Sequence, residues 1–273
     1  MTPLVDCHSH TAFSGHGHGT VADAVARAEE LGLAVYCQTE HMWMPERLDA
    51  AHACSMSREQ VGEYRDACLE QRARLAQAKS PLVFVVGTEI DWFAGRAPQL
   101  EELCAGFEYV LGSVHHVDEW AYDDPDELEH WDEHGTDRIW RRYFELWLEM
   151  AASTAPITTF SHPDLPKKFG FRPGFDPRLY YGEMAAAAAR KGAMVEVNVA
   201  GLHVAAGEMY PCQDLLRAFR DAGVECTVGC DAHRPQDIGR DVRDAYEWMA
   251  RAGYTHVSAP TPDGDRIRWK LEV

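Results

Sequence analysis

The amino-acid sequence predicts an α/β fold in which parallel strands and outer helices alternate and close into a barrel. Short apolar runs of strand length alternate about six times with helical patterns, which is typical of a parallel sheet built from βα units. The chain has 273 residues, a length that suits closure of such units into a barrel. Nearly every apolar run also ends in a histidine, aspartate or glutamate, and barrels carry their chemistry at the carboxyl ends of their strands.

Seven apolar runs have the character of buried strands. They lie just before Asp6 and at residues 33–39, 81–88, 109–114, 156–160, 193–199 and 224–229. The run at 81–88 is the least ambiguous and ends at Glu89. In the run at 193–199, Glu196 and Asn198 alternate with apolar neighbours.

Helical periodicity fills the intervals between these runs. The first helix is predicted from Thr20 to Leu31, because Thr20 and Asp23 can form a capping box and Gly32 follows the last turn. Further helices are predicted at residues 58–78, 99–104, 138–152, 177–190, 211–222 and 235–252. Four other stretches are predicted to be irregular: a loop over one end of the fold at 42–57, an acidic surface excursion at 118–137 that holds Trp120 and Trp131, a loop at 165–175, and the chain after residue 252.

Composition limits the class of protein. The hydrophobic fraction of 46% is ample for a large core, and no linker or repeat divides the chain, so residues 1–273 are predicted to form a single domain. No apolar run is long enough to span a bilayer and no secretion signal is present, so we expect a cytoplasmic protein without a membrane partner, whose eight cysteines are reduced.

The formal net charge of -18 argues against a nucleic-acid partner, since phosphate backbones select basic surfaces. A small anionic substrate remains compatible with this charge, because bound divalent cations reverse the local field. The sequence makes no prediction of the oligomeric state.

The strand ends predict a metal site. His8 and His10 are two residues apart on a strand, so their side chains point to the same face and can hold one ion. The small-residue loop that follows carries His16 and can fold back over the same site. The other candidate ligands at strand ends are His41, Glu89, His115, His162, Asp231 and His233.

Mixed imidazole and carboxylate ligands suit Zn, Mn or Fe ions, and a carboxylate can bridge two of them. Glu89 is the candidate for that bridge. The nine candidate ligands are too many for one tetrahedral ion, and three ions with three or four protein ligands each fit better.

A series of motifs occurs in order along the chain. It comprises Asp-x-His-x-His-Thr, Ser-Gly-His, Thr-Glu-His, Gly-Thr-Glu, Gly-Ser-Val-His, Ser-His-Pro-Asp-Leu-Pro-Lys-Lys-Phe-Gly, Glu-Val-Asn-x-Ala-Gly-Leu and Asp-Ala-His-Arg-Pro. The ordered set resembles the polymerase-and-histidinol-phosphatase (PHP) superfamily, and within it the histidinol-phosphate phosphatase branch. The resemblance covers essentially the whole chain and implies a distorted seven-stranded (βα) barrel with a trinuclear metal site.

Residue by residue, the resemblance implies three ligand sets. They are His8, His10, Glu89 and Asp231 for one ion, Glu89, His115 and His162 for a second, and His16, His41 and His233 for a third.

The implied reaction is hydrolysis of a phosphate monoester, with L-histidinol phosphate of histidine biosynthesis as the expected substrate. A hydroxide that bridges two ions would attack phosphorus in line with the leaving alkoxide, without a protein nucleophile. Asp231, His233 or a metal-bound water would protonate the leaving group.

Four residues are candidates for contacts with the phosphate. Lys167, Lys168 and Arg234 follow strand-end ligands and can neutralise charge, although a solvated loop is an equally good interpretation of them. At His203 the family pattern has an arginine, and imidazole is neither permanently charged nor bidentate.

Other functions remain open at this point. They are a PHP-type phosphatase for another small ester, an amidohydrolase-like hydrolase with one or two ions, a DNA-editing exonuclease of the PHP type, and a metal-binding module without activity. Among the remaining histidines, His18 and His116 are expected nearest the site. Glu40 stands where family members usually have aspartate, a change expected to lengthen a contact behind the metal ligands.

Overall fold

The computed structural model describes residues 1–273, and at its centre seven parallel strands run in sequence order. They are β1 (Val5–Asp6), β2 (Val35–His41), β3 (Val83–Asp91), β4 (Tyr109–Ser113), β7 (Thr159–Phe160), β8 (Met194–Asn198) and β9 (Cys226–Gly229). Each strand pairs in parallel with the next. All seven coincide with the predicted apolar runs, because strands covered on both faces are continuously apolar.

Backbone hydrogen bonds also join the first and last strands. The Cys7 amide donates to the Val228 carbonyl at 2.9 Å, and the Asp231 amide donates to the His8 carbonyl at 2.9 Å. Ser9 and Ala232 form a parallel bridge just beyond the two strands. The sheet therefore closes on itself, and the predicted distorted (βα)7 barrel is confirmed.

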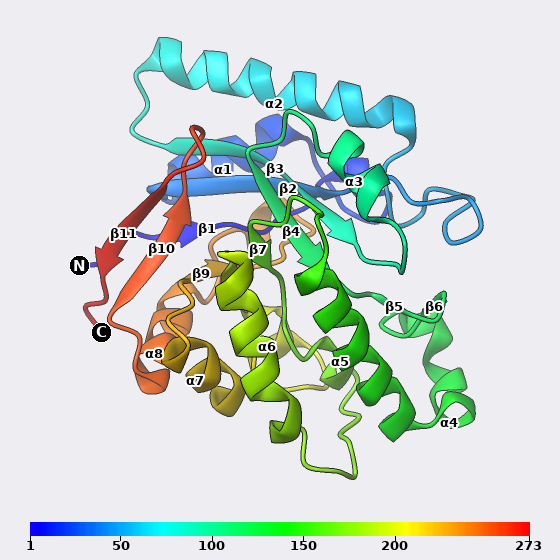
Figure 1. Cartoon of the computed structure of the whole chain (residues 1–273). Coiled ribbons are helices and arrows are strands. Elements are labelled where there is room, and N and C mark those ends of the chain that lie inside the picture. Colours follow the sequence, from blue (N-terminus) through cyan, green and yellow to red (C-terminus); the bar gives the residue numbers. More distant parts are fainter.

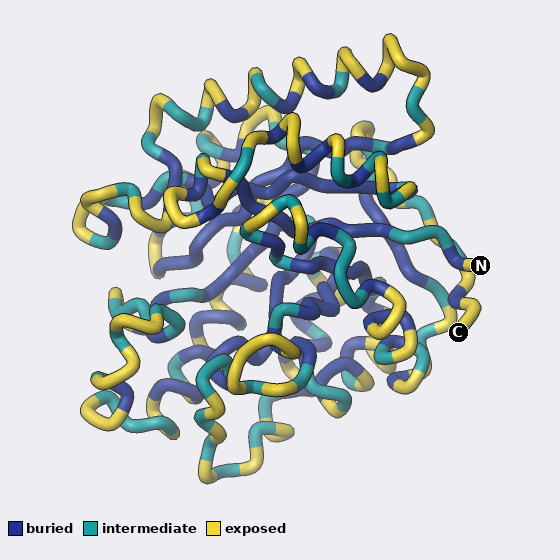
Figure 2. Tube along the Cα trace, turned by 180° about the vertical axis from the view of Figure 1, so that it is seen from behind, coloured by how far each residue is buried: buried dark blue, intermediate teal, exposed yellow.

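Helices cover the outside of this barrel (Figure 1). The longer ones are α1 (Val21–Glu30), α2 (Arg58–Ala78), α3 (Ala97–Leu103), α5 (Thr136–Ala152), α6 (Arg178–Lys191), α7 (Gln213–Asp221) and α8 (Val242–Ala252). The predicted capping box of α1 is present, since the Thr20 hydroxyl accepts from the Asp23 amide and the Asp23 carboxylate accepts from the Thr20 amide. Figure 2 shows the barrel strands as buried and the outer turns of the helices as exposed.

Short 3-10 turns connect several elements. They are η1 (Ala12–Ser14), η2 (Pro125–His130), η3 (Leu165–Lys167), η4 (Val199–His203) and η5 (Pro235–Asp237). The helix predicted at 235–252 is therefore split, because Gly239 and Asp241 adopt positive φ between η5 and α8.

The prediction of an irregular chain after residue 252 is wrong. β10 (His256–Pro260) and β11 (Arg266–Lys270) form an antiparallel hairpin, which lies beside both termini in Figure 1. Along β11, Ile267 and Trp269 are half-buried while their neighbours are exposed. This alternation is the pattern of a strand with one covered face.

The acidic segment 118–137 is more ordered than a surface excursion. It contributes β6 (Trp120–Ala121), which pairs with β5 (His116–Val117), and also η2 and α4 (Trp131–His134). Trp131 is buried, its indole N–H donates to the Tyr122 carbonyl at 2.8 Å, and its ring stacks on Phe171. These elements lie on the side of the molecule away from the termini (Figure 1).

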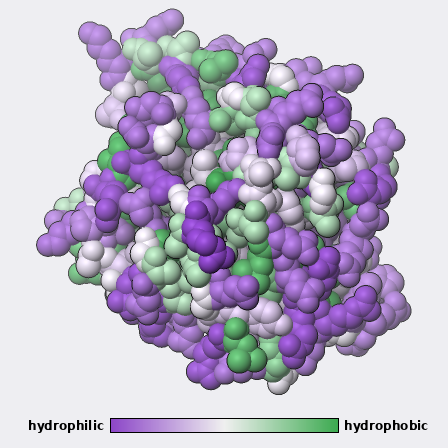
Figure 3. Space-filling model, in the orientation of Figure 1, coloured by the Kyte–Doolittle hydropathy of each residue, from purple (hydrophilic) through white to green (hydrophobic).

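The surface in Figure 3 is largely hydrophilic with small scattered apolar areas. No helix combines the length and apolar character needed to cross a bilayer.

Candidate metal centre

The candidate ligands meet at the carboxyl ends of the barrel strands. His8, His10 and His16 follow β1, His41 ends β2, and Glu89 lies near the end of β3. The others follow β4, β7 and β9. A cavity of about 390 Å³ opens over them. Its lining includes His16, His41, Glu89, His115, His162, Asp231 and His233. His8 and His10 are buried beneath, so the structure brings all nine candidates to one mouth of the barrel.

The first group consists of His8, His10, Glu89 and Asp231. The Nε2 atoms of His8 and His10 are 3.0 Å apart, and His8 Nε2 lies 3.1 Å from Glu89 Oε2. Asp231 Oδ1 lies 3.3 Å from His10 Nε2. Ligands of a tetrahedral Zn ion with bonds of about 2.0 Å lie roughly 3.3 Å from one another. His8, His10 and Asp231 are therefore spaced as ligands of a common ion could be, with Glu89 in contact with both histidines.

A second group uses the other oxygen of Glu89. Glu89 Oε1 lies 2.9 Å from His162 Nε2 and 3.5 Å from His115 Nε2. The two histidine nitrogens are 3.2 Å apart. The two carboxylate oxygens of Glu89 thus face different sets of histidines, an arrangement compatible with a bridging carboxylate.

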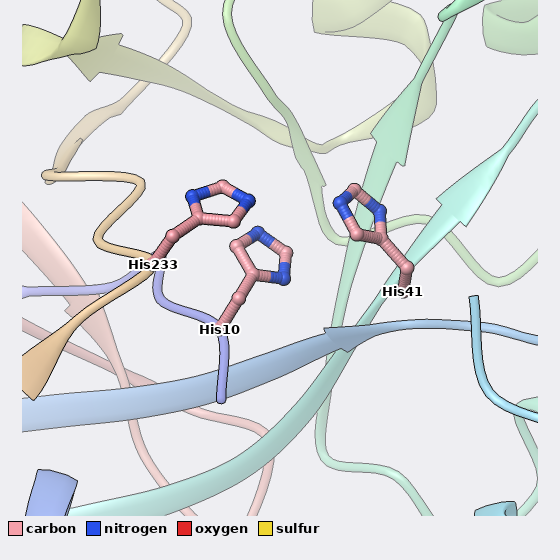
Figure 4. Close-up of side chains that lie close together, drawn as sticks. All are labelled: His10, His41 and His233. Carbon is pink, nitrogen blue, oxygen red and sulfur yellow. The ribbon is translucent and has the colours of Figure 1, made fainter. Parts of the chain in front are cut away.

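The third group differs in detail from the set that the resemblance implies. His16 Nε2 lies 2.7 Å from His233 Nε2, as expected for a shared ion. The ligand atoms of His41, however, gather with those of His10 and His233, all within 4.8 Å of one another. Figure 4 shows these three imidazoles close together. His41 Nδ1 also lies 3.1 Å from Glu89 Oε2, so His41 stands between the first and third groups.

Glu196 forms hydrogen bonds with two of these candidate ligands and was not among the site residues predicted from the sequence. Its Oε1 lies 2.8 Å from His8 Nδ1, and its Oε2 accepts from the His162 amide at 2.8 Å and from the Asn198 side chain at 3.1 Å. Hydrogen bonding at Nδ1 fixes the His8 ring so that Nε2 is free to bind a metal. The available signal was the alternation of Glu196 and Asn198 in a fully buried strand, because polar side chains there need partners.

Two further carboxylates orient candidate ligands, one by direct contact and one through a hydroxyl group. Asp91 Oδ1 lies 2.8 Å from His115 Nδ1, and so directs His115 Nε2 toward the centre. Glu40 is fully buried and accepts from the Thr11 amide at 2.8 Å, while its other oxygen accepts from the Ser14 hydroxyl. Ser14 in turn lies 3.2 Å from His10 Nδ1. Glu40 therefore acts on His10 through Ser14 rather than by direct contact.

The electrostatics divide the histidines into two kinds. Burial opposes protonation of His10, but hydrogen bonds with Asp231 and Glu89 raise its pKa to about 9. Burial likewise opposes protonation of His115, but Asp91, Asp123 and Glu89 raise its pKa to about 10. By contrast, burial and the charge of His10 lower the pKa of His233 to about 3. His233 is therefore neutral at pH 7, whereas His10 and His115 are protonated in the metal-free chain.

This difference predicts that metal uptake releases protons. His10 and His115 must each lose a proton before Nε2 can bind an ion, and their raised pKa values keep those protons in place up to about pH 9. We expect metal affinity to rise with pH between 7 and 9, with net proton release at pH 7. Calorimetric titration of Zn into metal-free protein, in buffers of different ionisation enthalpy, measures the number of protons released per chain. A value of zero would contradict the prediction.

The four candidates for phosphate contacts lie in different surroundings. Lys168 lines the cavity, and its Nζ lies 3.1 Å from Asp123 Oδ2. Lys167 is buried outside that lining, where its Nζ lies 3.0 Å from Asp164 Oδ2.

The other two are exposed. His203 Nε2 lies 2.6 Å from Asp241 Oδ2, and Arg234 is exposed on the segment before η5. Only Lys168 of the four is therefore at the cavity. His116 also lines the cavity, whereas His18 is exposed and its amide donates to the His233 carbonyl at 2.8 Å.

Comparisons of the sequence with a family model and with known proteins indicate the same family. The model of the PHP domain matches residues 6–200. The "Probable histidinol-phosphatase" of Deinococcus radiodurans is 34% identical over 256 residues, covering 93% of this chain and 95% of that protein. The "Probable histidinol-phosphatase" of Thermotoga maritima is 24% identical and covers 97% of each chain.

Among solved structures, the fold is similar to that of histidinol phosphate phosphatase from Lactococcus lactis, complexed with Zn, L-histidinol and phosphate. The TM-score is 0.77 at 20% identity, and the match covers 97% of this chain and 98% of that one.

Proposed function

Because this chain belongs to the PHP domain family and is a metal-dependent phosphatase of that family, we propose that it hydrolyses L-histidinol phosphate to L-histidinol and phosphate. The observation that carries this proposal is the position of Glu89, whose two oxygens face separate sets of histidines at one cavity. The relative from Deinococcus radiodurans, at 34% identity over 93% of the chain, supports the choice of substrate. Within a cell we expect the enzyme in the cytoplasm, in histidine biosynthesis.

The residues present fit a cluster of metal ions. Nitrogen atoms of neighbouring histidines lie 2.7 to 3.2 Å apart, and the buried His41 Nδ1 has no hydrogen-bond partner. We assign three ions to the site, chosen among Zn, Mn and Fe. His8, His10, Glu89 and Asp231 would hold one, Glu89, His115 and His162 a second, and His16, His41 and His233 a third.

When bound, such ions supply positive charge to phosphate oxygens and make a coordinated water more acidic. The chain itself positions the substrate and moves protons. Asp231 is anionic, because nearby His8 and His10 hold its pKa well below the usual range against the opposing effect of burial. His233 is neutral and its ring lies 3.7 Å from Asp231 Oδ1. Both groups are therefore proton acceptors, and we assign to this pair the transfer of a proton from the attacking water to the leaving alkoxide.

Lys168 is the only lysine or arginine in the lining of the cavity, and we assign it to the phosphate. Substitution of Lys168 by Met should raise KM for L-histidinol phosphate about tenfold, since one charge-assisted hydrogen bond is worth about 1.5 kcal/mol. The kcat should change by less than about threefold, because the ions remain in place. The matched control is Lys270→Met in β11, at the hairpin beside the termini, and an unchanged KM in Lys168→Met would remove Lys168 from this role.

A panel of phosphate monoesters tests the proposed substrate. We expect kcat/KM for L-histidinol phosphate to exceed that for any other ester of the panel by at least about tenfold, with about three metal ions per chain in the same sample. Preference for another small ester would change the assigned substrate but not the assigned reaction, hydrolysis of a phosphate monoester. That outcome has one specific observation in its favour, because His203 occupies the place of an arginine and pairs with Asp241 instead. Release of nucleotides from single-stranded DNA would overturn the proposal.

A further inference from the structure

Arg96 carries a buried charge that no carboxylate contacts directly. The side chain is only 3% exposed, and no carboxylate oxygen lies within 4.0 Å of its nitrogens. Fully buried arginines in proteins are almost always paired with an anion. The guanidinium of Arg96 is therefore an exception that needs an explanation.

Its existing contacts are neutral. Arg96 Nη1 donates to the Asp91 carbonyl at 2.6 Å, and Nη2 donates to the Trp43 carbonyl. The buried Nε has no hydrogen-bond partner. Two carbonyls thus fix the orientation of the group, but neither supplies a countercharge, and Nε is left without a partner.

A cavity of about 220 Å³ lies against this group. Its lining includes a second guanidinium, that of Arg47, together with Trp43, Phe93 and Gln99. Burial and the neighbouring charge of Arg47 lower the pKa of Arg96 to about 10, with Asp91 opposing the shift. Two guanidinium groups therefore line one cavity, and an anion between them would relieve the repulsion between their charges.

We propose that this cavity binds a small oxyanion, a carboxylate or a phosphate, held by Arg96 and Arg47. Guanidinium groups recognise such oxyanions through paired N–H donors. The cavity shares no lining residue with the one over the metal centre, so the site is separate from the phosphatase site and does not depend on its substrate.

The site is nonetheless connected to the metal centre through the backbone. Arg96 donates to the carbonyl of Asp91, and the carboxylate of Asp91 orients His115. Occupancy of the site therefore bears directly on the residue that positions one candidate ligand.

Selenate is a suitable probe, because its position can be read from anomalous diffraction. Crystals of the metal-loaded protein soaked in selenate should show a peak in contact with Arg96 and Arg47, in addition to any peak at the metals. The same soak of Arg47→Gln should show that peak weakened or absent. Arg47 is largely exposed and pairs with Glu119 at 2.8 Å, so its substitution should leave the fold intact.

Calorimetric titration of sulfate into the metal-loaded protein tests the site in solution. We expect Arg47→Gln to bind sulfate about fivefold more weakly at the site that Arg96 forms. The control is Arg58→Gln, since Arg58 stacks on the Trp43 ring at 4.0 Å without lining the cavity, and it should bind as the wild type does. Selenate found only at the metals, or identical sulfate binding by wild type and Arg47→Gln, would overturn the proposal.

Discussion

Substitution of Glu89 by Gln is expected to lower kcat/KM for phosphate release by about 10³-fold, because several kcal/mol of metal-dependent stabilisation depend on this side chain. Glu89 is the one candidate ligand that we assign to two ions, with His8 near one oxygen and His162 near the other. A neutral amide keeps the volume of the side chain but removes the negative charge that both ions need. We therefore expect at least one ion per chain to be lost, as measured by elemental analysis.

The control for this variant is Glu63→Gln, a change on the exposed face of α2. Circular dichroism should show the same secondary structure for Glu89→Gln, Glu63→Gln and wild type. A Glu89→Gln protein that keeps its full metal content and turnover would exclude Glu89 as a bridge. A protein that keeps metal but loses turnover would place Glu89 in the reaction and not in metal binding.

The second large effect is expected at Glu196, which lies behind the ligands. Glu196→Gln should weaken metal binding by about 10- to 100-fold, as is usual when a group that orients a metal-binding histidine is altered. The carboxylate holds the His8 ring at Nδ1 and accepts from the His162 amide. An amide in its place can make only one of these contacts as an acceptor without rearrangement.

Competition with a chelator of known affinity measures this loss. Saturating metal should restore most of the kcat of Glu196→Gln, because the ligands themselves remain. The exposed Glu183→Gln in α6 is the control. An unchanged metal affinity would show that the contact between Glu196 and His8 serves only the packing of the barrel.

The barrel could be predicted from the sequence because each strand is buried on both faces, which makes runs such as the one ending at Glu89 continuously apolar. The hairpin of β10 and β11 was missed because β11 is covered on one side only, so that exposed charged residues alternate with Ile267 and Trp269. Trp131 was assigned to the surface because acidic neighbours surround it, yet its own ring is buried against Phe171.

At the site, the nine candidate ligands could be predicted because strand ends of a barrel converge at one mouth. The role of Glu196 could not, since it depends on closure of the barrel, which brings His8 after β1 within 2.8 Å of Glu196 on β8, with only β9 between the two strands. Lys167 looked available in the sequence, but the turn at Asp164, with φ of 65°, folds the lysine back into a buried ion pair with that aspartate. The contacts of Glu196 with His8 and of Lys167 with Asp164 depend on the fold and cannot be inferred from residue spacing alone.

The closure of the barrel between β1 and β9 affects when the protein can bind metal during its synthesis. The first proposed ion takes His8 from the beginning of the polypeptide and Asp231 from near its end, and it would act as a clasp across this joint. A nascent chain on the ribosome cannot complete the clasp until almost the whole sequence has emerged. Loading of this first ion would therefore be a late event of biogenesis, and chains cut short before Asp231 would lack one ligand each of the first and third proposed ions.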